Sequence, residues 1–176
     1  MILSGQDIKK FGLLLDAKDS NYQAQGCDIR LDKVFYPVDK PFGEKITEAD
    51  YKEYLPRRFF TGSGEKAEGY IIPPNTSVLF KIMETVDLRA KIASITTFRY
   101  FNAYVLPKSS LSRRGVIVHS AWWDAGYKGS GFVLVRTTDV PLTIKPGAEF
   151  AQMVFIEGSP TESVYDGQYQ NEGLKQ

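Results

Sequence analysis

The chain has 176 residues, of which 43% are hydrophobic, and its 22 basic residues nearly balance its 21 acidic ones. This length fits one domain with a real core, and the small net charge gives no bulk electrostatic reason to expect binding to nucleic acid or an anionic membrane. A single cysteine, Cys27, excludes an internal disulfide framework and any metal site built from several cysteines.

The chain carries no sign of membrane insertion or export. No apolar run approaches the roughly 20 residues of a membrane-spanning helix. The N-terminal residues lack the basic segment and long apolar stretch of a signal peptide. We therefore expect a cytoplasmic protein without a membrane partner.

A short helix is expected at the N-terminus. Ser4 is a suitable N-cap, and Asp7 stands three residues later, where a capping-box acid would lie. Ile8, Phe11 and Leu15 recur at the spacing of one helical face.

Beyond this helix, short apolar or alternating runs are separated by proline, glycine, asparagine and aspartate. This pattern is typical of an all-β sandwich or barrel-like domain. Residues 39–68 are polar and rich in glycine, lysine and glutamate, so we expect an excursion from the sheets with one short helix near 47–55. Residues 160–176, called the tail below, are polar and are expected to be mobile.

The segment 107–129 concentrates the chemistry of the chain. Lys108 supplies an ammonium group, and Ser109 and Ser110 supply hydroxyl groups at a turn whose backbone N–H groups suit phosphate oxygens. Arg113 lies on the same side if this segment begins a helical turn. A solvated, serine-capped turn explains the same residues without any ligand.

An acid and a tyrosine follow in a glycine-containing turn. A carboxylate such as Asp124 can orient and deprotonate a water, which typically contributes ~10²–10⁴-fold in rate; it can equally cap its own turn. Tyr127 suits stacking on a sugar or base, or is an ordinary aromatic residue of a β domain. An extended backbone would point Trp122 and Trp123 to opposite faces, so we expect one in the core and one at the surface.

Four segments resemble, in order, the motifs of the dUTPase/dCTP deaminase superfamily, and most closely those of its archaeal-type dUTPase branch. They are GCDIRL at 26–31, PKSSLSRRG at 107–115, AWWDAGYKGSG at 121–131 and PGAEFAQMVF at 146–155. The opening MILSGQDI and the tail segment YDGQYQ resemble the deaminase-like members, so the resemblance covers almost the whole chain. Lys108 stands where the second motif usually has arginine. The lysine ammonium group cannot make the bidentate contact with phosphate that an arginine guanidinium makes.

The resemblance implies a single dUTPase-like domain over residues 1–176, folded as a distorted β jelly roll with a short N-terminal helix. It also implies a homotrimer with active sites at subunit interfaces. It assigns roles to twelve residues. They are Asp124 as the catalytic acid; Lys108, Ser109, Ser110, Arg113 and Gln152 at the phosphates; Tyr127, Ala121 and Val118 at the sugar and base; Asp28 in support; and Tyr169 and Gln170 in the tail.

The resemblance also narrows the reaction. Deaminase members carry a glutamate in the strand after the third motif, whereas the strand from Gly131 to Arg136 has no carboxylate. The expected reaction is therefore hydrolysis of dUTP to dUMP and pyrophosphate, in which water activated by Asp124 attacks the α-phosphorus. Mg²⁺ would be held mainly by the substrate phosphates. The alternatives are a dCTP deaminase, alone or bifunctional, and a non-catalytic nucleotide-binding jelly-roll protein.

Overall fold

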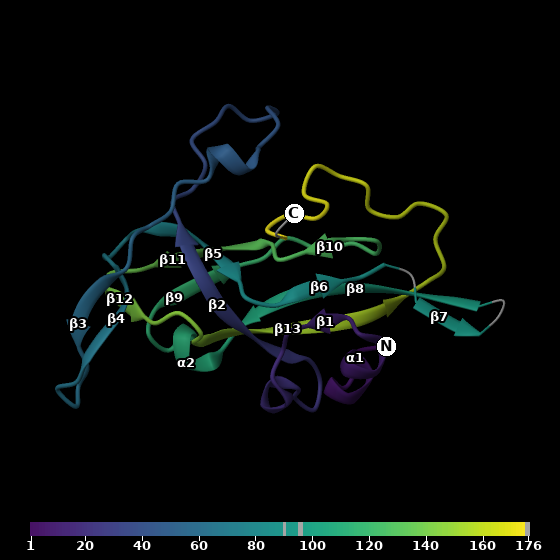
Figure 1. Ribbon diagram of the computed structural model, residues 1–176, viewed down its shortest axis with the longest axis horizontal. Coiled ribbons are helices and arrows are strands. Elements are labelled where there is room, and N and C mark those ends of the chain that lie inside the picture. Colours follow the sequence, from purple (N-terminus) through teal and green to yellow (C-terminus); the bar gives the residue numbers. More distant parts are fainter. Residues whose placement is uncertain (90, 95–96, 175–176) are drawn as a thin grey trace.

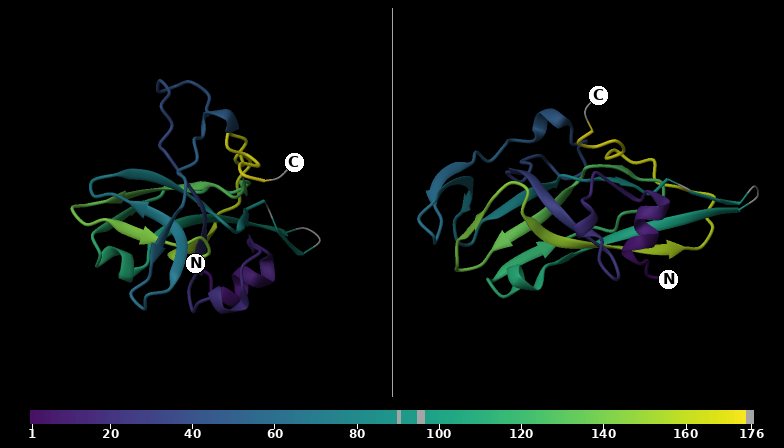
Figure 2. Two further views of the ribbon diagram at one scale, coloured as in Figure 1. Left: turned by 60° about the vertical axis from the view of Figure 1, so that its left-hand side comes forward. Right: turned by 60° about the horizontal axis from the view of Figure 1, so that its bottom comes forward.

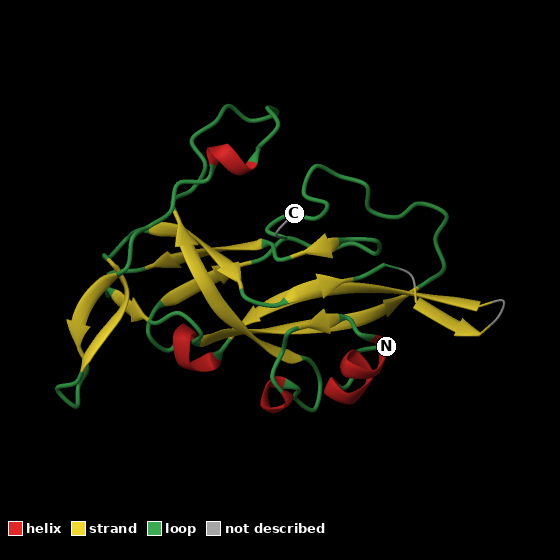
Figure 3. Cartoon of the chain, in the orientation of Figure 1, coloured by secondary structure: helices red, strands yellow, loops and turns green. Residues whose placement is uncertain are grey.

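The computed structural model describes residues 1–89, 91–94 and 97–174, most of which lie in β-strands and the loops between them (Figure 1). Antiparallel strands build three sheets in this described part of the chain, and its helices are short and peripheral (Figure 3). The all-β, jelly-roll-like fold expected from the sequence is confirmed.

The largest sheet has seven strands. Its strands alternate between buried and exposed residues, as in β11, where Val133 and Val135 are buried while Leu134 and Arg136 face outward. This alternation places one face of the sheet on the core. In sheet order, the strands are β7 (Lys91–Ser94), β8 (Thr97–Pro107), β13 (Glu149–Gly158), β2 (Cys27–Phe35), β5 (Ser77–Ile82), β11 (Phe132–Thr137) and β9 (Val116–His119).

Two three-stranded sheets complete the domain. One contains β1 (Leu14–Leu15), β6 (Thr85–Asp87) and β10 (Lys128–Gly129) in that order, so β10 is an edge strand. The other contains β12 (Leu142–Ile144), β4 (Lys66–Ile72) and β3 (Arg57–Phe60), and the β3–β4 hairpin extends to the left in Figure 1.

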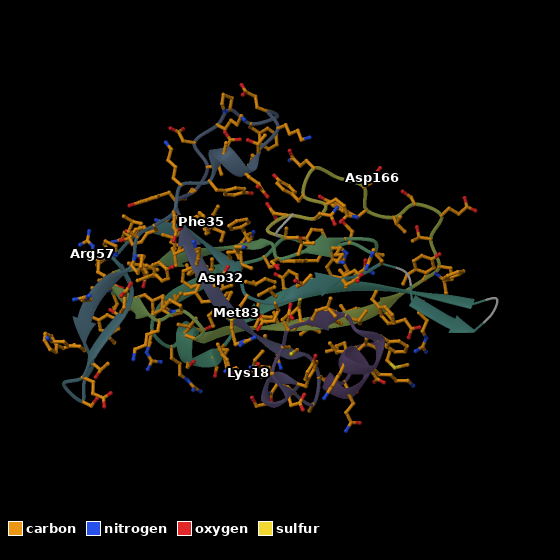
Figure 4. All side chains as sticks on the ribbon, in the orientation of Figure 1. Lys18, Asp32, Phe35, Arg57, Met83 and Asp166 are labelled. Carbon is orange, nitrogen blue, oxygen red and sulfur yellow. The ribbon has the colours of Figure 1, made fainter. Side chains whose placement is uncertain are left out.

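The core between the sheets is built from aliphatic and phenylalanine side chains, and Figure 4 shows how side chains fill this space. Phe80 and Phe150 meet edge to face with their ring centroids 5.2 Å apart, a preferred geometry for aromatic pairs. The largest fully buried side chains are Phe80, Phe101, Phe150, Phe155, Ile8, Leu13, Leu14, Ile29, Leu31, Ile72, Ile82 and Leu88.

The N-terminal helix forms as expected. Helix α1 spans Gly5–Phe11, and the Asp7 amide donates to the Ser4 hydroxyl at 3.1 Å. The helix ends at Gly12, whose left-handed backbone (φ 59°) is typical of a C-cap. Ile8 is fully buried, so the apolar face packs on the core. Among the described residues, no helix is both long and apolar enough to cross a membrane.

The helix expected near residues 47–55 is shorter in the structure than this segment. Only a 3₁₀ turn forms, over Glu48–Asp50, with a second such turn at Asp19–Asn21. The chain becomes extended at Tyr51, because its ring stacks on Phe132 with centroids 4.4 Å apart. Tertiary packing of this aromatic ring therefore overrides the local helical tendency.

The first part of the excursion, residues 39–55, lies beside the tail on one side of the molecule, as both views in Figure 2 show. Its last part was expected outside the sheets, but residues 57–60 and 66–68 pair in the β3–β4 hairpin. The Ile46 amide donates to Gln168 Oε1 at 3.3 Å, and the Tyr51 hydroxyl donates to Glu172 Oε1 at 2.6 Å. Asp166, labelled in Figure 4, is exposed on the tail. The tail is thus docked in this structure, and its mobility remains a prediction.

Candidate functional site

The loop that carries Asp124 is fixed to the middle of β8. Trp123 and Ala103 exchange two backbone hydrogen bonds of 2.9 and 3.0 Å, and the Ala125 amide donates to Asn102 Oδ1 at 2.9 Å. Asp124 stands between these two anchored residues, and its side chain is exposed. The loop therefore presents the exposed Asp124 carboxyl group between two residues that are hydrogen-bonded to β8.

The paired tryptophans divide as the sequence predicts. Trp123 is 8% exposed, and its indole N–H donates to the Ser120 hydroxyl at 3.2 Å. Trp122 is 50% exposed and faces Tyr104, with ring centroids 6.5 Å apart.

A cleft of about 390 Å³ opens beside this loop. Two carboxyl groups reach it, those of Asp124 and Glu172, and Ala121 also lines it. A cleft of this volume with aromatic walls and few polar groups is typical of a small-molecule site. The aromatic walls come from Tyr51, Trp122, Trp123, Tyr127, Phe132, Tyr165 and Tyr169.

Tyr127 lies at the inner end of the loop and is 6% exposed. Its ring packs edge to face on Trp123 at 5.1 Å and on Tyr165 at 5.7 Å. Burial raises the pKa of its hydroxyl group, which is therefore neutral. Within the described part of the chain, this buried hydroxyl has no hydrogen-bond partner.

Glu172 is a cleft residue that the sequence analysis missed. Burial raises the pKa of its carboxyl group, while the hydrogen bond from Tyr51 and the charge of Lys81 act in the opposite direction. Its Oε2 atom and the Tyr127 hydroxyl both lie within 3.3 Å of the position that a Cβ on Gly131 would take. No local signal in the sequence marks this acid, because the tail brings it there from outside the recognised motifs.

The proposed phosphate residues form a second cluster at the end of β8. Lys108 Nζ donates to Asp28 Oδ2 at 2.8 Å and to Glu149 Oε2 at 2.7 Å. Burial disfavours the Lys108 charge, but the two carboxylates outweigh this effect and raise its pKa. Phosphate would therefore have to compete with two carboxylates for this ammonium group.

Gln152 and Asp28 belong to the same cluster. They are direct partners in the β13–β2 ladder, and such partners share one face of a sheet. The Gln152 side chain lies over Gly26, where a Cβ would stand 3.1 Å from Gln152 Cγ. The structure thus brings together Asp28, Lys108 and Gln152, and their roles remain predictions.

The serines and the arginine follow directly on α2 (Ser109–Ser112). The expected helical turn is confirmed, since the Arg113 amide donates to the Ser109 carbonyl at 3.0 Å. Ser109, Ser110 and Arg113 are all exposed.

Within one chain the two clusters are well separated. Trp123 pairs with Ala103 on β8, whereas Lys108 follows the last residue of that strand. Five residues of strand span about 16 Å, and Figure 1 shows α2 toward the lower left of the sheets and β10 toward their upper right. One chain therefore does not bring Asp124 to its own phosphate-type cluster.

The remaining predicted residues take different positions. Val118 lies in β9 opposite Val135 and is half-buried rather than in the cleft. Tyr169 lines the cleft, whereas Gln170 bonds to the loop backbone. No group of three or more metal-ligating side chains occurs among residues 1–89, 91–94 and 97–174.

These features define a jelly-roll-like β domain with an aromatic small-molecule cleft beside an exposed aspartate. The model of the dCTP deaminase-like family matches residues 2–158, and the chain belongs to this family. It is an enzyme of the dCTP deaminase/dUTPase superfamily, so the resemblance seen in the sequence is confirmed. The family match ends before the tail.

Two curated relatives have nearly the full length of this chain. A "dCTP deaminase, dUMP-forming" from a Sulfurihydrogenibium species is 31% identical over 98% of this chain and 93% of its own length. A deoxyuridine 5'-triphosphate nucleotidohydrolase from Methanocaldococcus jannaschii is 28% identical over 96% of this chain and 98% of its own length.

A solved structure supports the fold. The 2'-deoxycytidine 5'-triphosphate deaminase from Agrobacterium tumefaciens superposes with a TM-score of 0.64 at 18% identity. The match covers 89% of this chain but only 48% of that protein.

Proposed function

We propose that this protein is a dUTP pyrophosphatase, which converts dUTP and water into dUMP and pyrophosphate. The observation that carries this proposal is the exposed Asp124 carboxylate on a rigid loop beside an aromatic cleft of about 390 Å³. The nucleotidohydrolase name of the Methanocaldococcus jannaschii relative supports the same reaction.

Asp124 acts as the base in this mechanism. Its carboxylate orients a water and takes a proton from it as the oxygen attacks the α-phosphorus of dUTP. The bond from this phosphorus to the bridging oxygen breaks, and pyrophosphate leaves. Ser109, Ser110, Arg113 and Gln152 donate to phosphate oxygens, whose charge they offset in the transition state.

Mg²⁺ is the proposed cofactor. This ion prefers oxygen ligands and retains waters, so the triphosphate itself supplies most of its coordination. When bound, the ion neutralises phosphate charge.

We propose a homotrimer with shared active sites, because each chain separates its base from its phosphate residues. Asp124 and Tyr127 of one subunit would face Arg113 and the serines of a neighbour. A symmetric assembly would repeat this contact at every interface.

One assay tests the reaction. Purified protein is incubated with dUTP, dCTP or UTP in the presence of Mg²⁺, and pyrophosphate and ammonia are measured. Pyrophosphate release from dUTP without ammonia release from dCTP is expected. Binding of dUTP without turnover would instead favour a non-catalytic nucleotide-binding protein.

Glu172 supports a second candidate function, deamination of dCTP. The strand β11 has no carboxylate, but the tail places one in the cleft that Asp124 also reaches. A carboxyl group can move protons as water adds to the pyrimidine and ammonia leaves. If the wild type releases ammonia from dCTP and Glu172→Gln does not, deamination is the function that this cleft performs.

A further inference from the structure

We propose that Gln170 is a positioning residue, through which the tail holds the loop that carries Asp124 and Tyr127. The expected effect on dUTP turnover rests on the proposed function. The contact between Gln170 and the loop does not depend on it. Gln170 does not line the cleft, so its effect on catalysis passes through the loop.

The first observation is that the tail pairs with an otherwise open sheet edge. β10 is the edge strand of its sheet. On its outer side, the Asn171 amide donates to the Lys128 carbonyl at 2.7 Å, and the Ser130 amide donates to the Glu172 carbonyl at 2.8 Å. Backbone groups on a sheet edge need such partners, so the tail serves as a short additional strand.

The second observation is that the Gln170 side chain acts as a peptide group in this pairing. Its Oε1 accepts from the Lys128 amide at 2.7 Å, and its Nε2 donates to the Gly126 carbonyl at 2.9 Å. A side-chain amide offers both a donor and an acceptor. One side chain therefore bridges the two residues on either side of Tyr127.

The third observation is that glycines in the loop make room for the tail. A Cβ on Gly126 would lie 2.7 Å from Val164 Cβ and 2.9 Å from the Tyr165 nitrogen. A Cβ on Gly129 would lie 2.8 Å from the Glu172 carbonyl oxygen. The loop and the tail thus fit each other at backbone distance.

The excursion supports the tail from the opposite side. Glu172 accepts the Tyr51 hydroxyl at 2.6 Å, and Gln168 accepts the Ile46 amide at 3.3 Å. Hydrogen bonds therefore link the excursion to the tail and the tail to the loop, with Gln170 at the second of these contacts. This arrangement assigns the excursion a role that its sequence alone does not indicate.

The expected consequence is kinetic. A catalytic group displaced by about 1 Å can lose ~10²-fold in rate. Loss of the Gln170 bridge should therefore lower kcat for dUTP by about 10- to 100-fold, with little change in KM. A residue that touched the substrate in the ground state would raise KM instead.

The test compares Gln170→Met with Gln6→Met, which removes an exposed amide on α1. Amide exchange at Lys128, measured by NMR on free protein, should be at least about fivefold faster in the first variant. It should be unchanged in the second, and both should keep the wild-type far-UV spectrum. Unchanged exchange in Gln170→Met, or a raised KM with wild-type kcat, would overturn the proposal. If wild-type protein does not hydrolyse dUTP, the proposed function is wrong. The amide exchange at Lys128 then shows by itself whether Gln170 holds the loop.

Discussion

The Tyr51 hydroxyl donates a 2.6 Å hydrogen bond to the Glu172 carboxyl group, which joins the excursion to the tail inside the cleft. Burial raises the pKa of Glu172 above its ordinary value of 4.5, and Glu48 adds to this shift. Tyr51 and Lys81 oppose it without reversing it. The docked tail therefore favours a protonated Glu172.

This shift predicts a pH dependence with a definite sign. Between pH 4.5 and the raised pKa, the docked state binds more protons than the undocked state, so docking weakens as pH rises through this window and is strongest below it. We expect tail amides to exchange faster as pH rises, after correction for intrinsic rates. Glu172→Gln should flatten this dependence, whereas Glu162→Gln, at an exposed tail position, should not. Equal slopes in wild type and Glu172→Gln would contradict the prediction.

Replacement of Asp124 tests the base directly. Asp124→Asn keeps the shape of the side chain but removes its ability to accept a proton, so turnover of dUTP should fall by ~10²–10⁴-fold or more. Binding of a non-hydrolysable dUTP analogue, measured by calorimetry, should be nearly unchanged. Asp139→Asn at an exposed turn is the control. Substantial pyrophosphate release by Asp124→Asn would exclude the assigned role.

Shared active sites can be tested by mixing two inactive variants. Asp124→Asn lacks the base, and Arg113→Ala lacks a phosphate contact that we assign to the neighbouring subunit. After co-refolding in equal amounts, about one quarter of interfacial sites should receive both intact residues, and activity should reappear. If the mixture stays inactive while size measurements show mixed trimers, each chain supplies its own complete site.

The sequence predicts those structural features that are determined within short segments of the chain. The Ser4 cap sets the start of α1, and residues 121–127 fold as a loop with one tryptophan buried and one exposed. The position of Glu172 could not be predicted, because its partner Tyr51 lies 121 residues away in the chain. The ion pairs of Lys108 were missed for the same reason, since its two carboxylate partners come from β2 and β13.

The Lys108 cluster should contribute to stability as well as to binding. Asp28 is 7% exposed, so Lys108→Met would leave a largely buried carboxylate without its cation. We expect the free energy of unfolding to fall by about 1–3 kcal/mol in urea titrations. The exposed Lys66→Met should change it by less than about 0.5 kcal/mol. Adding Asp28→Asn to Lys108→Met should recover part of the loss, and no recovery would mean that the ion pair is not its cause.

Alanine variants of two glycines with similar backbone angles distinguish the effect of tail docking from the effect of backbone strain. Gly126 has φ 99° and Gly43 has φ 95°, but a Cβ on Gly126 would meet Val164 and Tyr165, whereas one on Gly43 would meet nothing within 4 Å. Both alanine variants should carry the strain of a positive φ, about 1 kcal/mol. Only Gly126→Ala should also release the tail, which would appear as rapid cleavage between residues 160 and 174 in limited proteolysis. Equal cleavage of the two variants would show that the tail docks without needing the space that Gly126 leaves.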